Sequence, residues 1–135
     1  MAQLFKIKRT NTILYCCRWA ETVVFYRDRL QLAVAYQNDW LVEFRLSETA
    51  FLSVADQSRT SLSSAEGDGI TLSFQTEDLP AVHRHLTDLG VAPSAIRSQV
   101  LGADVFYIFD PDGTRIELWC RMRSQGTASA SLPGI

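Results

Sequence analysis

The sequence predicts an α+β fold with two βαβββ modules, whose curved mixed sheets surround an open, barrel-like cleft and carry their helices on the convex side. Three observations predict it. The order strand, helix, three strands occurs twice, a Ser- and Gly-containing polar stretch separates the two copies, and each predicted helix has one apolar stripe. The 135 residues suit a single domain. We expect module one at about 10–56, a linker at 57–68, module two at about 69–122 and a flexible tail at 123–135.

The first module begins with a β-rich run, TNTILYCCR at 10–18, which predicts a strand. In the segment WAETVVFYRDRLQL that follows, apolar residues recur at helical spacing, which predicts a helix. Three short β-like runs start at Leu32, Trp40 and Thr49. Polar pairs at 38–39 and 47–48 are the expected turns between these strands.

The second module repeats this order, starting with a strand at 69–75. A helix is predicted over 78–89, with Asp78 as N-cap, Pro80 in its first turn and Gly90 as the stop signal. Strands are predicted at 95–99, 104–109 and 114–121. The turn DPDG at 110–113 separates the last two, because proline presets one backbone dihedral and glycine permits a positive one.

Composition describes an ordinary soluble protein, with 47% apolar residues, 21% charged residues and a formal net charge of −2. Such values give no basic footprint for nucleic acid and no charge block for an anionic membrane. No apolar run approaches the roughly 20 residues that span a bilayer, and the N-terminal segment lacks the features of a secretory signal. Three cysteines without regular spacing indicate reduced thiols, so we expect a cytoplasmic protein.

Alternation of side chains along each strand predicts which residues face the cleft. In the last strand Ile116, Leu118 and Cys120 form an apolar face that suits a helix contact, while Glu117 and Trp119 lie on the other face. The same argument over the other strands gives a cleft-facing set of Asn11, Tyr15, Ser53, Thr71, Ser73, Glu117 and Trp119. An apolar cavity with a few fixed polar groups is typical of a small-molecule site; otherwise these are the polar sides of half-exposed sheets.

With this doubled order, the runs AETVVFYRDRL and FDPDGTRIEL resemble the vicinal oxygen chelate superfamily over residues 10–122. That superfamily includes glyoxalase I, bleomycin-resistance proteins, fosfomycin-resistance enzymes and extradiol dioxygenases. The resemblance implies a homodimer with its functional cavity in the curved sheets. Metal-dependent members hold a divalent ion at four strand positions, which map here onto Asn11, Ser53, Gly69 and Glu117, and only Glu117 is a usual ligand at its position.

No metal or other cofactor is therefore predicted. A divalent ion is expected only under the alternative hypothesis, in which a degenerate metal site remains. One carboxylate, one amide and one hydroxyl do not compensate for the dehydration of such an ion. The two histidines, His83 and His85, lie two residues apart on the second predicted helix and face different directions. We expect His83 to border the helix–sheet contact and His85 to face solvent.

The leading hypothesis is a metal-free protein that binds a small, partly apolar molecule, such as an antibiotic or metabolite that it would sequester, with neither nucleic acid nor membrane as a partner. Tyr15, Tyr107 and Trp119 would stack on the ligand, and Glu117 would pair with a cationic or donor group. The full predicted ligand-binding set is Asn11, Tyr15, Cys17, Ser53, Thr71, Ser73, Tyr107 and Trp119.

The alternative is a lyase, isomerase or dioxygenase-like enzyme in which Glu117 is the catalytic residue, as a base or as part of a degenerate metal site. A carboxyl group among apolar neighbours is harder to ionise and can serve as a base for removing a proton next to a carbonyl. Cys17 is a weaker nucleophile candidate, because no histidine is expected beside it. A third possibility is an interaction module with an unused cleft.

Overall fold

The computed structural model describes residues 3–99 and 102–121, and the predicted tail at 123–135 lies outside them. It contains two four-stranded mixed sheets, which confirms the α+β class and the doubled βαβββ order. The chain divides into two compact units. The first runs to Gly69 and also includes Asp110–Gly113, and the second comprises Ile70–Phe109 and the chain from Thr114.

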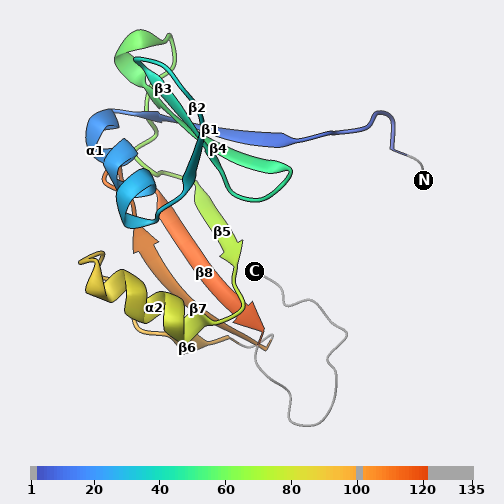
Figure 1. Ribbon diagram of the computed structural model, residues 1–135, viewed down its shortest axis with the longest axis vertical. Helices are drawn as coiled ribbons and strands as arrows, with labels where there is room; N and C mark the ends of the chain where they lie inside the picture. Colours follow the sequence, from blue (N-terminus) through green and yellow to red (C-terminus); the bar gives the residue numbers. More distant parts are fainter. Residues whose placement is uncertain (1–2, 100–101, 122–135) are drawn as a thin grey trace. The chain divides into compact units, whose positions relative to one another are not determined.

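The first unit holds one sheet with the order β1-β4-β3-β2, in which β1 runs parallel to β4 and the other pairs are antiparallel (Figure 1). Its elements are β1 (Thr10–Cys16), α1 (Trp19–Val24), β2 (Ala33–Gln37), β3 (Leu41–Arg45), β4 (Ala50–Asp56) and a short 3₁₀ helix (Gln57–Arg59). One face of the sheet is apolar and packs on α1. It buries Leu14 and Cys16 from β1 and Leu52 and Val54 from β4, as alternation predicts.

The first helix departs from the prediction of one regular helix. After Val24 it continues as a π-helical turn over Phe25–Arg29, in which the Leu30 N–H donates to the Phe25 carbonyl at 2.9 Å. Both Phe25 and Tyr26 are buried, and the Tyr26 ring lies 5.9 Å from that of Phe44 in β3. π-Helical segments are rare, and those that occur are mostly single turns within α-helices.

The second unit repeats the arrangement with the order β5-β8-β7-β6. Its elements are β5 (Thr71–Gln75), α2 (Leu79–Asp88), β6 (Arg97–Ser98), β7 (Ala103–Phe109) and β8 (Arg115–Arg121). The strand predicted at 95–99 is reduced to the two residues of β6. Helix α2 lies against β7 and β8 (Figure 1).

The predicted start of α2 is confirmed, because the Asp78 side chain accepts a hydrogen bond from the Ala81 N–H at 3.1 Å. The two histidines also lie where they were expected. His83 packs edge-on against Phe106 of β7 with ring centroids 4.9 Å apart, and His85 is exposed. Both side chains therefore belong to the helix, one at its packed side and one toward solvent.

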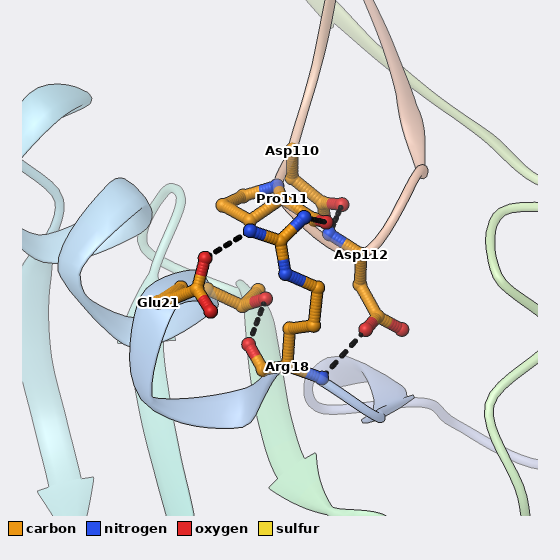
Figure 2. Close-up of polar contacts among 6 residues, drawn as sticks. Arg18, Glu21, Asp110, Pro111 and Asp112 are labelled. Atoms are coloured by element: carbon orange, nitrogen blue, oxygen red, sulfur yellow. Dashed lines mark hydrogen bonds and ion pairs between the residues drawn. The ribbon is translucent and has the colours of Figure 1, made fainter.

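The turn between β7 and β8 belongs to the first unit and contacts the start of α1 (Figure 2). The Arg18 N–H donates to Asp112 Oδ1 at 2.8 Å, and the Arg18 guanidinium donates to the Pro111 carbonyl at 3.0 Å and pairs with Glu21. The buried Tyr26 hydroxyl donates to Asp110 Oδ2 at 2.7 Å. The signature run DPDG thus holds the N-terminus of α1 as well as turning the chain.

Gly113 completes this turn with φ at +97°, a conformation that side chains disfavour. A Cβ at this position would lie 2.6 Å from the backbone carbonyl oxygen of Glu66. Glycine is therefore required here for conformation and for space.

Among the described residues, no helix is both long enough and apolar enough to cross a membrane.

Candidate functional site

A polar row crosses the second sheet on the face opposite α2. Ser73 of β5 and Tyr107 of β7 are the direct neighbours of Glu117 on β8. The Glu117 side chain is buried, with 5% of the residue exposed, and the Ser73 hydroxyl donates to its Oε1 at 2.7 Å. Ser73 is exposed and Tyr107 is half-buried. The carboxylate therefore lies at the centre of the sheet, with an accessible hydroxyl on one side and an aromatic ring on the other.

Two further residues of β8 flank this row, because residues two apart in a strand share a face. Arg115 donates from Nε to the Thr71 hydroxyl at 3.0 Å, and its guanidinium carbon lies 4.7 Å from the centroid of the Tyr107 ring. Trp119 packs in a small buried cluster with Ala103 and Val105, against which Tyr107 also packs.

Five of the predicted site residues are therefore neighbours on one face of this sheet: Thr71, Ser73, Tyr107, Glu117 and Trp119. Arg115 lies on the same face but was not among the predicted site residues. The sequence contains the information needed to place Arg115. It lies two residues before Glu117, as Trp119 lies two residues after it, so alternation puts all three side chains on one face.

The first sheet gathers a different set on its corresponding face. The Ser53 hydroxyl donates to Asn11 Oδ1 at 3.0 Å, and Asn11 Nδ2 donates to Glu43 Oε2 at 3.3 Å. Arg9 pairs with the same Glu43 oxygen at 2.7 Å. Tyr15, half-buried, follows Asn11 on this face of β1. Asn11 and Ser53 therefore bond to each other, within a network that already contains a closed ion pair.

Two arginines lie over the ring of Phe51 on the same face, and neither was predicted as a site residue. The guanidinium carbons of Arg9 and Arg45 lie 3.6 Å and 4.8 Å from the centroid of that ring. Glu43 was also missed. Alternation along β3 places Glu43 and Arg45 on one face, but only the strand register brings them beside Ser53 and Phe51.

Cys17 follows the last residue of β1, and its exposed thiol lies 4.0 Å from Glu66 Oε1. Its described contacts include no imidazole base. Its neighbour Cys16 is buried, and burial together with the charges of Asp112 and Asp110 raises the pKa of that thiol to about 12. Within each described unit, Cys17 is thus given no histidine that would activate it.

Three of the four positions that the resemblance implies for metal ligands, Asn11, Ser53 and Glu117, lie in strands of the structure. Ser53 pairs with Ile13 on β1, and Glu117 pairs with Ser73 on β5.

Gly69, the position inferred from the sequence, precedes β5 and belongs to the first unit. Glycine has no side-chain ligand, so of these four positions only Asn11, Ser53 and Glu117 offer one. Within residues 3–99 and 102–121 there is no group of three or more His, Cys, Asp or Glu side chains placed to hold a metal ion.

Known proteins share this architecture. The chain superposes on a glyoxalase/bleomycin resistance protein/dioxygenase from Nocardioides with a TM-score of 0.71 and 14% identity, covering 98% of this chain and 92% of that one. TnmS3, an antibiotic binding protein from a Streptomyces strain, gives a TM-score of 0.71 and 16% identity over 90% of this chain and 99% of that one. Lactoylglutathione lyase from Agrobacterium tumefaciens gives 0.66 and 21% identity over 82% and 91%.

No curated protein sequence matches the chain. The model of the Glyoxalase/Bleomycin resistance protein/Dioxygenase superfamily matches residues 6–118. That match covers most of the chain and confirms the resemblance carried by its two motifs. The chain belongs to the Glyoxalase/Bleomycin resistance protein/Dioxygenase superfamily.

Proposed function

We propose that this protein binds a small organic molecule on the sheet face around Glu117 and does so without a divalent metal ion. The environment of Glu117 is the observation that carries this proposal. Within the described residues Ser73 is its one hydrogen-bond donor, and no basic side chain lies within ion-pair distance. A buried carboxylate without a cationic partner is costly. A ligand that donates to Glu117 would offset that cost.

The residues at the four ligand positions do not suit a divalent ion. Asn11 supplies an amide, Ser53 supplies a hydroxyl, Gly69 supplies no side-chain ligand, and only Glu117 supplies a carboxylate. Ions of the zinc, nickel or iron kind favour several imidazole or carboxylate ligands. The oxygens of Asn11 and Ser53 also take part in their mutual hydrogen bond. These donors support metal-free binding and give no basis for metal-dependent lyase or dioxygenase chemistry.

An antibiotic or an aromatic metabolite is the ligand class that we propose for this face. Tyr107 and Trp119 offer aromatic surface beside Glu117, and one protein of the same fold is an antibiotic binding protein. We also propose that the protein is cytoplasmic and forms a homodimer. Light scattering on the purified chain would test the homodimer. A monomer at all concentrations would contradict the dimer.

The test of binding is a thermal-shift screen of aromatic antibiotics and acyl compounds, followed by calorimetric titration of the hits. Glu117→Gln is expected to weaken binding at least about tenfold, which corresponds to about 1.4 kcal/mol. Glu77→Gln changes an exposed glutamate of the same unit and is expected to bind like the wild type. If every hit binds Glu117→Gln normally, the site lies elsewhere. Stoichiometric metal in the purified protein would contradict the metal-free proposal.

A second candidate function is proton abstraction next to a carbonyl, with Glu117 as the base. It is favoured by the hydrogen bond from Ser73, which fixes one carboxylate oxygen and leaves the other to meet a substrate. Hits that contain a carbonyl would then exchange the adjacent proton for deuterium in D₂O, as followed by NMR. Glu117→Gln should abolish the exchange. Exchange no faster than in buffer, for hits that bind, would leave the protein a binder only.

A further inference from the structure

Two opposite charges share the candidate face without neutralising each other. Arg115 and Glu117 are two residues apart on β8, so their Cα atoms are separated by about 6.6 Å along the strand. Among the described residues neither side chain forms an ion pair. The Glu117 carboxylate and the Arg115 guanidinium are therefore neighbouring charges on this face.

Arg115 is held in place by neutral groups on both sides. Thr71 on β5 accepts from its Nε at 3.0 Å, and the Tyr107 ring on β7 lies 4.7 Å from its guanidinium carbon. Neither contact uses the charge in an ion pair, and both restrict the long side chain. A guanidinium fixed in this way can present its two terminal nitrogens to a carboxylate in a bidentate pair.

In the first sheet the position equivalent to Tyr107 holds a charged residue that is part of an ion pair. Glu43 is the cross-strand neighbour of Ser53, as Tyr107 is of Glu117, so Glu43 and Tyr107 are equivalent in the two sheets. Glu43 pairs with Arg9 at 2.7 Å and accepts from Asn11. The first sheet thus pairs Glu43 with an arginine, whereas the corresponding residue in the second sheet, Tyr107, offers Arg115 an aromatic ring and no carboxylate.

We propose that the ligand of this face carries a carboxylate next to an amino or hydroxyl group, on an apolar body. The carboxylate binds Arg115, the amino or hydroxyl group donates to Glu117, and the apolar body contacts the ring of Tyr107. Amino acids and 2-hydroxy acids with aromatic side chains have this arrangement. The inference rests on the proposed function and narrows its ligand class.

Four probes that share a phenyl body separate the two polar contacts. L-phenylalanine and L-3-phenyllactate carry both groups, 3-phenylpropanoate lacks the donor, and 2-phenylethylamine lacks the carboxylate. Calorimetric titration of the wild-type protein is expected to show that the first two bind at least about tenfold more tightly than the last two. Equal affinities for all four probes, or no binding by any of them, would overturn the inference.

Variants then assign the carboxylate contact. Arg115→Gln is expected to weaken phenylalanine binding at least about tenfold and to leave 2-phenylethylamine binding unchanged. Arg84→Gln removes an exposed arginine of α2 in the same unit and serves as the matched control, with circular dichroism confirming that both variants fold. Unchanged phenylalanine binding by Arg115→Gln would overturn the assignment.

This design separates the two proposals. Screening hits that depend on Glu117 but not on Arg115 would refute the ligand class alone and preserve the binding function. Hits that depend on neither residue would refute the proposed function of the face.

Discussion

Buried polar groups in the first unit are paired with each other around the turn at 110–113. Tyr26 donates to Asp110, and the Cys16 thiol lies close enough to Asp110 and Asp112 for their charges to affect it. Burial is the largest cause raising the pKa of both Cys16 and Tyr26, followed for Cys16 by the charge of Asp112 and for Tyr26 by that of Asp110. Both side chains therefore stay protonated in the folded protein at pH values where the unfolded chain ionises them.

Stability should consequently fall at alkaline pH. The pKa of Cys16 is about 12 in the folded state against 9.0 for an ordinary thiol, so its contribution is complete below pH 9 and is lost as the pH rises toward 12. Tyr26 adds a loss above pH 10. Urea unfolding at about pH 8 and about pH 11 should show a smaller drop for Cys16→Ala than for the wild type. Cys17→Ala, which removes the exposed neighbouring thiol, is the control, and equal drops in all three proteins would contradict the assignment.

Among the structural elements, those predicted correctly depend on short-range chemistry. The N-cap of α2 and the turn before β8 follow from residues within a few positions of each other, because capping and turn preferences are local. The π-helical turn after α1 and the shortening of the strand at 95–99 had no such signal. They depend on packing and pairing across the fold, which local propensity does not report.

Strand alternation explains how much of the candidate site the sequence could predict. It placed Ser73, Glu117 and Trp119 on one face, because side chains alternate with a period of two. It gave no information on Arg9 or Glu43, whose contacts with each other and with Asn11 join segments that are far apart in the chain.

The turn before β8 can be tested with a matched pair of glycines. Gly113 and Gly102 both have positive φ, but an added Cβ would lie 2.6 Å from the Glu66 carbonyl at Gly113 and would meet nothing within 4 Å at Gly102. Both alanine variants should lose about 1–3 kcal/mol from backbone strain, and Gly113→Ala should lose more because of the clash. Chemical denaturation would measure both losses. A loss at Gly113 no larger than at Gly102 would show that the turn adapts without cost.

At the scale of the whole molecule, the chain leaves the second unit after β7, contributes four residues to the first unit and returns as β8. Within this four-residue segment, Asp112 forms two hydrogen bonds to other parts of the first unit. It accepts from the Arg18 N–H at 2.8 Å and from the Ser64 hydroxyl, so it joins the turn to the start of α1 and to the segment that follows β4. The hairpin that carries Glu117 and Arg115 is thereby tied into the hydrogen bonds of the first unit.

This connection predicts that the two units unfold together. Trp19 and Trp40 report on the first unit and Trp119 on the second, so fluorotryptophan labelling gives separate ¹⁹F signals for each during urea unfolding. In the wild type the three signals should change with one midpoint, as expected for a cooperative domain. Asp112→Ala removes the acceptor for Arg18 and Ser64 and should separate the Trp119 transition from the other two. Asp68→Ala, which changes an exposed aspartate of the first unit, should keep a single midpoint. Coincident transitions in Asp112→Ala would mean that the hydrogen bonds of Asp112 are not needed for the two units to unfold together.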